Sequence, residues 1–329
     1  MQINKEKLFV KHIITILLSG LLLTNIGCKN AHGILELVPA ESQKGFNYPY
    51  YLFLPEEGLN GDQIFLIVEP NNTGTTTDDF DKHTEAAKQQ VRSSQIGNYL
   101  SHKLKFPLLV PVFPRPENDW KTYTHALDRD ALMQKSNSIE RLDLQLIAMY
   151  KDAKIKLSRS GHVVEDKFIM CGFSACATFT NRFTAIHPQI VKACVAGGLN
   201  GILILPTTNI GGKPMPYPIG ISDLKDLTGH QFDSVSFSQI PQFLFMGEND
   251  DNDAAPYEDA YDDSEREIIY NILGKQMLPD RWNYCGNYYQ KNNFNAEIRT
   301  YPKVGHEITD EIQEDILSFI KTSINNKPK

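Results

Sequence analysis

The sequence has no excess of positive charge and no block of basic residues. Its 33 lysine and arginine residues are outnumbered by 40 aspartate and glutamate residues, which gives a formal net charge of −7. Nucleic-acid-binding surfaces are basic patches or stripes, so no nucleic-acid partner is predicted. Internal repeats and low-complexity linkers are also missing. The 329 residues fit one large domain or two ordinary ones, and without a linker we expect one.

Cysteine is scarce, and no C-x-x-C motif occurs among the five cysteines, which argues against a zinc site. An exported protein could pair the four cysteines beyond the N-terminal region. Three of them lie in or beside apolar runs, where buried free thiols are common. The sequence therefore leaves open the disulfide state of these residues, which are Cys171, Cys176, Cys194 and Cys285.

A calcium-binding pattern is missing as well. The most acidic stretch is "ENDDNDAAPYEDAYDDSERE", residues 248–267. A helix-loop-helix calcium site needs glycine at the sixth position of its loop and glutamate at the twelfth. Counted from Asp251, those positions hold Pro256 and Asp262. No metal ion and no other cofactor is predicted.

Residues 1–27 are predicted to be a signal peptide. Lysines precede the short apolar run "IITILLSGLLLTNIG", and this order is typical of secretory signals. The run is too short to cross a bilayer core of about 30 Å comfortably as a helix. Gly27 followed by Cys28 resembles the lipobox of bacterial lipoproteins, although Asn25 stands where that motif prefers leucine.

The lipobox resemblance implies that Cys28 carries lipid. The protein would then be exported and held at the bacterial cell membrane or cell surface by that anchor. An ordinary signal peptide or an uncleaved anchor is the alternative.

Apolar runs alternate with helical patterns along the rest of the chain. This alternation predicts an α/β fold with a mostly parallel central sheet and helices on both faces. Strands are expected at 48–55, which we take as an edge strand, and at 63–70, 106–113, 167–173, 191–198, 241–248 and 296–302. Helices are expected at 78–100, 138–157, 175–188 and 307–321.

The predicted elements divide the chain into segments. Residues 28–47 are expected to form a tether, 48–323 the folded domain and 324–329 a tail. Residues 199–240 are rich in glycine and proline and form the longest irregular stretch. A loop of that length inside a compact domain is often a lid or a binding loop, so a lid-like insertion is expected there.

The stretch "FIMCGFSACATF", residues 168–179, is nearly a G-x-S-x-G motif centred on Ser174. A sharp turn from strand to helix at this serine requires small residues two positions before and after it. Gly172 meets that need, and Cys176 is larger than glycine but still small. In an open parallel sheet, active sites lie at the carboxyl ends of the strands. Ser174 is therefore a candidate nucleophile, and the alternative is that it only caps the helix.

An acid and a histidine each follow a strand at the same predicted edge. Strand 241–248 leads to Asp250, and strand 296–302 leads to His306. A serine hydroxyl needs a base to take its proton, and a carboxylate orients that base and stabilises its charged form. Asp251 and Asp253 compete with Asp250 for the role of the acid. Asp250 is favoured because it lies on the first turn beyond the strand.

The chain resembles the α/β-hydrolases of the secreted esterase type, which include polyhydroxyalkanoate-depolymerase-like and feruloyl-esterase-like enzymes. The matching stretches are "YYLFLP", "FIMCGFSACATFTNRFTAIHP", "VKACVAGG", "FLFMGENDD" and "YPKVGHE", and the pattern covers roughly residues 48 to 323. The order serine, aspartate, histidine is that of this fold. The resemblance implies that Ser174 is the nucleophile, Asp250 the acid and His306 the base.

The oxyanion loop departs from the pattern of these esterases. They usually carry His-Gly where this chain has "PNNTG", residues 70–74. One backbone N–H is then expected from Asn71 or Asn72 and the second from Ala175, because Pro70 has no N–H to donate. The alternative is that "NNTG" is simply a turn.

The loop after strand 106–113 carries a mixture of side chains suited to a substrate. Trp120 and Tyr123 could stack on a sugar or phenolic ring, Arg115 could bind a carboxylate, and His125 lies beside them. Loop packing and ion pairs are the alternative. The second aromatic cluster, at 281–294, precedes a strand and is expected to be structural.

Taken together, these patterns predict an exported serine hydrolase that cleaves carboxylic esters through an acyl-enzyme. Its substrate would be a small-molecule or polymeric ester. A serine peptidase on the same fold is one alternative. The other is a non-catalytic binding protein that retains the hydrolase scaffold.

Overall fold

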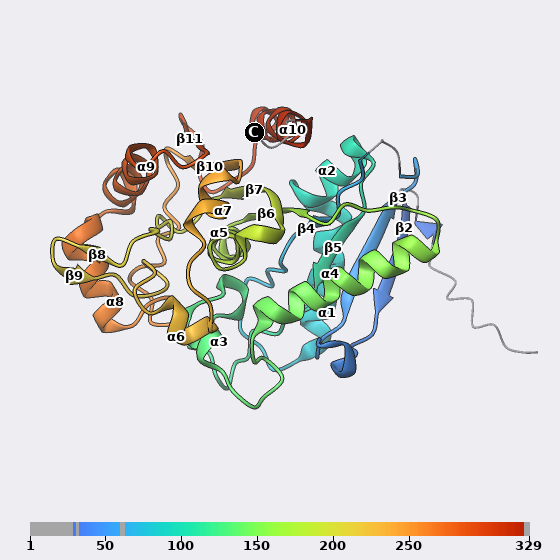
Figure 1. Ribbon diagram of the computed structural model, residues 1–329, viewed down its shortest axis with the longest axis horizontal. Helices are drawn as coiled ribbons and strands as arrows, with labels where there is room; N and C mark the ends of the chain where they lie inside the picture. Colours follow the sequence, from blue (N-terminus) through green and yellow to red (C-terminus); the bar gives the residue numbers. More distant parts are fainter. Residues whose placement is uncertain (1–28, 31–32, 60–62, 326–329) are drawn as a thin grey trace, which may run out of the picture.

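A computed structural model describes residues 29–30, 33–59 and 63–325 (Figure 1). Within these residues one sheet has nine strands in the order β1-β2-β3-β5-β4-β6-β7-β10-β11. The strands from β5 to β11 in that order run parallel, and β1, β2 and β3 pair antiparallel. The strands are β1 (Lys29–Asn30), β2 (Gly33–Val38), β3 (Tyr50–Pro55), β4 (Ile67–Val68), β5 (Leu108–Pro111), β6 (Phe168–Phe173), β7 (Val191–Gly197), β10 (Gln242–Gly247) and β11 (Ala296–Tyr301).

Helices cover both faces of the sheet. One face packs against α1 (Phe80–Ser93), α2 (Gly97–Leu104) and α10 (Asp310–Asn325), and the other against α4 (Leu142–Arg159), α5 (Ala175–Ile186) and α9 (Trp282–Lys291). Alternate residues of a strand serve the two faces: Met170 lies in the cluster with α5, and Ile169 and Cys171 lie in the cluster on the other face. The expected fold class is confirmed.

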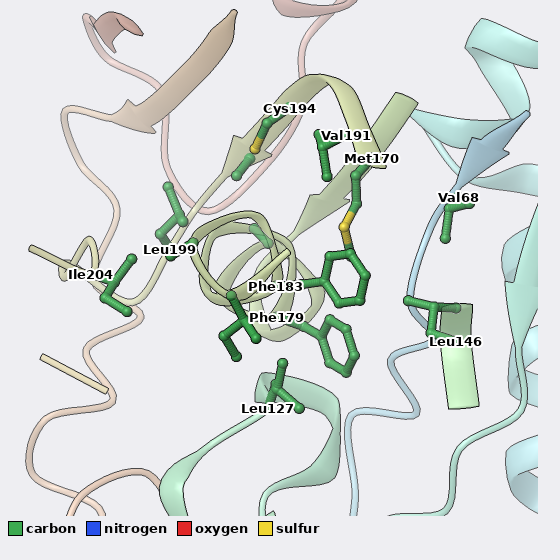
Figure 2. Packing of buried hydrophobic residues seen from close by; sticks show 14 of the residues in the cluster. Val68, Leu127, Leu146, Met170, Phe179, Phe183, Val191, Cys194, Leu199 and Ile204 are labelled. Carbon is green, nitrogen blue, oxygen red and sulfur yellow. The ribbon is translucent and has the colours of Figure 1, made fainter. Parts of the chain in front are cut away.

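The core around α5 encloses the helix on every side. Phe179 and Phe183 project from α5 between the sheet and the neighbouring segments, with Met170, Leu127 and Leu146 around them (Figure 2). Every residue of α5 is buried. Its polar side chains are buried as well and hydrogen-bond inside the protein: Thr180 Oγ1 donates to the Cys171 carbonyl, and Arg182 Nη1 donates to the Ala126 carbonyl. This packing fixes the position of the turn at the start of α5.

Two sequence predictions at the N-terminal side were wrong. Residues 33–38, assigned to a tether, form β2, and Phe46 is fully buried. Residues 48–55 were assigned to an edge strand, but β3 pairs with β2 on one side and β5 on the other. The apolar pattern of β2 is weak because Ile34 and Leu37 remain exposed, so the sequence did not indicate a strand there.

The insertion at 199–240 is packed rather than open. It contains the short hairpin β8 (Asn209–Ile210) and β9 (Lys213–Pro214) and the helices α6 (Leu224–Thr228) and α7 (Ser234–Gln239). Leu203, Leu205, Tyr217 and Phe237 are fully buried in the core on the α5 face. Together with α8 (Asp263–Ile268) and α9, the insertion forms the end of the molecule away from β2 and β3 (Figure 1).

The remaining elements are short. They are α3 (Arg129–Met133), the 3-10 helices η1 (Ser42–Lys44), η2 (Thr124–Ala126) and η3 (Pro188–Ile190), and the π-helices η4 (Ile269–Leu273) and η5 (Met277–Arg281). No helix in the described part of the chain combines the length and apolar character needed to span a bilayer. The four cysteines at 171, 176, 194 and 285 are free and buried. The predicted signal peptide and Cys28 lie outside the described residues.

Candidate active site

Ser174 occupies the turn between β6 and α5 in a strained backbone conformation. Its φ is +64° and its ψ −131°, a region that non-glycine residues seldom adopt. The Ser174 N–H donates to the Gly197 carbonyl at 2.9 Å, which ties the turn to the end of β7. The Ser174 side chain makes no capping hydrogen bond to α5. The geometry therefore does not support helix capping as the role of this hydroxyl.

Close approach of strand and helix explains the residues on either side of Ser174. A Cβ on Gly172 would lie 2.6 Å from the backbone carbon and oxygen of Cys176, so glycine is required there. Cys176 is tolerated because its thiol turns back onto the strand. The Phe173 N–H donates to Cys176 Sγ at 3.2 Å, and the Sγ–H donates to the Phe173 carbonyl at 2.9 Å.

His306 is paired with Asp250 at the same edge of the sheet. His306 Nδ1 lies 2.9 Å from Asp250 Oδ2, and the side chains are 26% and 1% exposed, respectively. A carboxylate only accepts hydrogen bonds, so Nδ1 carries the ring proton. In the neutral ring Nε2 is then unprotonated, and its lone pair can accept a hydrogen bond. The loop before His306 can come this close because residue 247 is glycine: a Cβ there would lie 2.3 Å from the Gly305 oxygen.

The two other candidate acids have different surroundings. Asp251 is exposed. Asp253 Oδ2 lies 2.5 Å from Nη2 of Arg281, a fully buried guanidinium. Of the three carboxylates, Asp250 is the one in contact with His306.

Asn252 is a site residue that sequence reasoning missed. Its Nδ2 lies 3.4 Å from Ser174 Oγ and 3.3 Å from His306 Nε2. Within the described residues, no hydrogen bond joins Ser174 Oγ directly to His306 Nε2. The nearness of Asn252 to the aspartates after β10 was visible in the sequence, but the fold of the loop was not.

The loop expected to form the oxyanion hole is held from two sides. The Asn71 side chain bonds both the N–H and the C=O of Phe113 at 2.9 Å. Gln90 accepts from the Asn72 N–H at 2.9 Å and donates to the Pro70 carbonyl at 2.8 Å. The Asn72 N–H is therefore engaged, contrary to its expected role as an alternative donor, which leaves the Asn71 N–H as the candidate.

The second expected donor is at the start of α5. Ala175 is the first residue of that helix, and the first N–H groups of a helix have no intrahelical acceptor. The turn interpretation of "NNTG" also agrees with the structure, because the Gly74 N–H donates to Asn72 Oδ1 at 3.1 Å. A turn and an oxyanion donor are compatible in one loop.

Three of the four residues proposed to contact substrate are engaged in packing. Arg115 Nη2 lies 2.5 Å from Asp259 Oδ2, and its guanidinium lies 3.8 Å from the centre of the Tyr123 ring. His125 is buried against the Phe113 carbonyl, and burial lowers its pKa to about 3, so it is neutral. Trp120 is 43% exposed. Long-range partners such as Asp259 could not be inferred from the loop itself.

Glu69 lies directly after β4 and just before the loop 70–74. Its Oε1 accepts from Ser94 Oγ at 2.8 Å, and its Oε2 is buried without a hydrogen-bond partner in the described residues. Burial raises the Glu69 pKa to about 7. A carboxyl in such a site is largely neutral at slightly acidic pH.

A cavity of about 360 Å³ lies beside the loop after β5. Its walls include Tyr48, Phe80, His83, Pro114 and Ile139, and it is not lined by Ser174, Asp250 or His306. No group of three or more metal-binding side chains occurs in the part of the chain that the structure describes.

Comparison with solved structures shows which fold this is. The poly(aspartic acid) hydrolase-1 from Sphingomonas sp. KT-1 matches with a TM-score of 0.54 at 14% identity over 88% of this chain and 96% of that one. A poly(3-hydroxybutyrate) depolymerase from Bordetella parapertussis matches with a TM-score of 0.51 at 14% identity over 90% of each chain. An S-formylglutathione hydrolase from Agrobacterium tumefaciens matches with a TM-score of 0.50 at 10% identity over 88% and 94%.

No family model and no curated protein matches the sequence. At these identities the structural likeness shows the fold alone, and that fold is the α/β-hydrolase fold.

Proposed function

We propose that the protein is a serine hydrolase that cleaves carboxylic esters with Ser174 as nucleophile, His306 as base and Asp250 as acid. The observation that carries this proposal is the placement of His306, which pairs with a buried carboxylate through Nδ1. Its Nε2 lies 3.3 Å from Asn252 Nδ2, which in turn lies 3.4 Å from Ser174 Oγ on the strained turn. The names of the similar structures, hydrolase and depolymerase, agree with this class of reaction.

The reaction would proceed in two halves. In the first, His306 Nε2 takes the proton of Ser174 Oγ while Oγ forms a bond to the ester carbon and the carbonyl electrons move onto oxygen. The tetrahedral intermediate then breaks its bond to the leaving alkoxide, which takes the proton from Nε2. In the second half, water repeats these steps on the acyl-enzyme and releases the acid and free Ser174.

The developing oxyanion requires backbone donors. The N–H of Ala175 at the start of α5 and the N–H of Asn71 are the proposed pair. Removal of one such donor typically lowers turnover by about 10² to 10³. Asn71 is held in place by its two side-chain bonds to Phe113, which fixes the backbone that would donate.

A fluorophosphonate probe tests the proposal directly. Wild-type protein should be labelled at Ser174 and should hydrolyse p-nitrophenyl esters faster than peptide anilides. Ser174→Ala should abolish both activities while leaving the circular dichroism spectrum unchanged. Labelling with preferential anilide cleavage would favour the peptidase, and an absence of labelling would favour the binding protein.

We also propose that the protein is exported and lipid-anchored through Cys28. The sequence around Gly27-Cys28 supports this proposal. In a bacterial host, Cys28→Ser should abolish incorporation of labelled palmitate and leave the precursor unprocessed. Unmodified native protein would contradict the anchor but not the hydrolase proposal.

A further inference from the structure

We propose that Asn252 is a positioning residue that holds the catalytic groups in a resting arrangement by donating to His306 Nε2 in place of Ser174. This inference rests on the proposed function. Asn252 contacts all three members of the candidate triad. Its backbone N–H donates to Asp250 Oδ1 at 3.0 Å, and its side-chain Nδ2 lies 3.3 Å from His306 Nε2 and 3.4 Å from Ser174 Oγ.

The orientation of the Asn252 amide follows from its partners. His306 Nδ1 faces the Asp250 carboxylate and must carry the ring proton, so Nε2 can only accept in the neutral ring. The amide group facing Nε2 is therefore the NH₂ end. One of its hydrogens is directed to the triad, and the other is donated to Asn200 Oδ1 at 3.1 Å.

The backbone position of Asn200 allows its side chain to accept a hydrogen bond from this amide. It is nearly buried on the loop after β7, and its φ of +49° is a conformation that asparagine tolerates better than most residues. The same loop approaches the histidine, because a Cβ on Gly198 would lie 2.9 Å from His306 Cε1. Asn252 itself is exposed, so an arriving substrate can displace its side chain.

The consequence is competition for one lone pair. The Ser174 O–H can donate to His306 Nε2 only when the Asn252 N–H no longer donates to that nitrogen. The separations of 3.3 and 3.4 Å are long for N–H donors, so the contact is weak enough to exchange during each turnover. The resting arrangement lowers the reactivity of Ser174 until the substrate occupies the site.

The first test measures the resting contact and does not depend on catalysis. In ¹⁵N NMR spectra, Asn252→Ala should move the His306 Nε2 resonance toward that of a nitrogen without a hydrogen bond, with little change at Nδ1. Asn249→Ala, which removes an exposed asparagine from the same loop, is the matched control and should move neither. An unchanged Nε2 resonance in Asn252→Ala would overturn the proposal even if the protein proved to be inactive.

The second test measures the reactivity of the serine. Asn252→Ala should increase the rate constant for fluorophosphonate labelling by about threefold to tenfold, the range expected when one neutral hydrogen bond no longer competes. Asn200→Gly, which suits the positive φ, should give a smaller increase, and the double variant should not exceed Asn252→Ala. Slower labelling in Asn252→Ala, with normal Ser174-dependent labelling in wild type, would reject this inference and leave the proposed function standing.

Discussion

At the scale of single residues, two aspartates three positions apart have different partners. Asp250 is buried against His306, whereas Asp253 pairs with the buried Arg281. Asp250 is therefore suited to orient a base. Asp253 instead anchors the loop after β10, which also carries Asp250. Sequence position favours Asp250 as the acid, but it does not reveal the pairing of Asp253 with Arg281.

We predict that Asp250→Asn lowers kcat by about 10³ to 10⁴, because the amide no longer fixes the histidine tautomer, while KM changes much less. Asp251→Asn should stay within about tenfold of wild type, near 1.4 kcal/mol. Steady-state kinetics on a p-nitrophenyl ester measures both.

Asp253→Asn should also stay within about tenfold in kcat, but it should lower the free energy of unfolding by about 2 kcal/mol, because a buried guanidinium loses its counter-charge. Urea denaturation measures this loss. A large loss of kcat at Asp253 with a mild effect at Asp250 would show that Asp253, and not Asp250, is the acid.

A further prediction concerns Gly172, two positions before Ser174. Gly172→Ala should destabilise the protein by about 3 kcal/mol or more and abolish labelling of Ser174, because the new methyl group would overlap the Cys176 backbone. Gly286→Ala is the matched control: it lies within α9, where a Cβ would meet Ile298 at an ordinary 3.6 Å. It should be neutral or stabilise by up to about 1 kcal/mol. If Gly172→Ala and Gly286→Ala changed the melting temperature equally, the close approach of β6 and α5 at Gly172 would be contradicted.

At the scale of elements, the carboxyl ends of the parallel strands assemble the site, and the antiparallel strands protect the sheet. β6 presents Ser174, while the loops after β10 and β11 supply Asp250 and His306. At the other side, β2 hydrogen-bonds along the whole length of β3. An uncovered strand edge is a template for aggregation. β2 keeps the apolar, buried β3 away from the edge of the sheet, and β1 in turn pairs with the first two residues of β2.

Truncation tests this role of β2. Removal of residues 1–28 should leave the melting temperature within a few degrees of wild type. Removal of residues 1–40 deletes β2 and the buried Val38, and it should lower the melting temperature markedly and promote aggregation, because β3 then becomes an edge. Thermal unfolding with light scattering measures both. If the two truncated proteins were equally stable, β2 would not be needed for stability, and residues 28–47 would act only as a tether.

At the scale of the whole molecule, buried carboxyl groups make stability depend on pH. Burial raises the pKa values of Glu69, Asp128 and Glu265 to about 7. Between their usual values and pH 7, the folded protein keeps protons that the unfolded chain has released. The free energy of unfolding therefore falls as pH rises through this window and changes little above it.

Glu69→Gln should remove one part of this dependence. With a usual pKa of 4.5 and a folded pKa of about 7, Glu69 accounts for about 3 kcal/mol of stability lost between pH 4.5 and pH 7. Unfolding by urea at pH 5 and pH 8 should thus show a smaller difference for Glu69→Gln than for wild type. The exposed Glu56→Gln should behave as wild type. An unchanged difference in Glu69→Gln would mean that Glu69 is ionised across this range.

The sequence by itself determined the fold class and the order of the three candidate catalytic residues. Continuous apolar runs that alternate with helical patterns indicate buried parallel strands. Such strands place their carboxyl ends at one edge of the sheet. Ser174, Asp250 and His306 could therefore be assigned to one edge of the sheet from their positions along the chain. Helical spacing also places Leu142, Leu146, Tyr150 and Ala153 on one face of a helix, and all four side chains are buried.

Only the tertiary structure decided what depends on contacts between distant segments. Gln90 accepts a hydrogen bond from the Asn72 N–H. Asp259 forms an ion pair with Arg115, and Asp253 forms one with Arg281. The partners are too far apart in the sequence for a local pattern to predict these contacts. The same holds for Asn252, whose amide reaches Ser174 and His306 because its loop turns back over the site. Local propensity and periodicity determine elements, whereas the path of a loop is set by the charges and hydrogen bonds that it meets after folding.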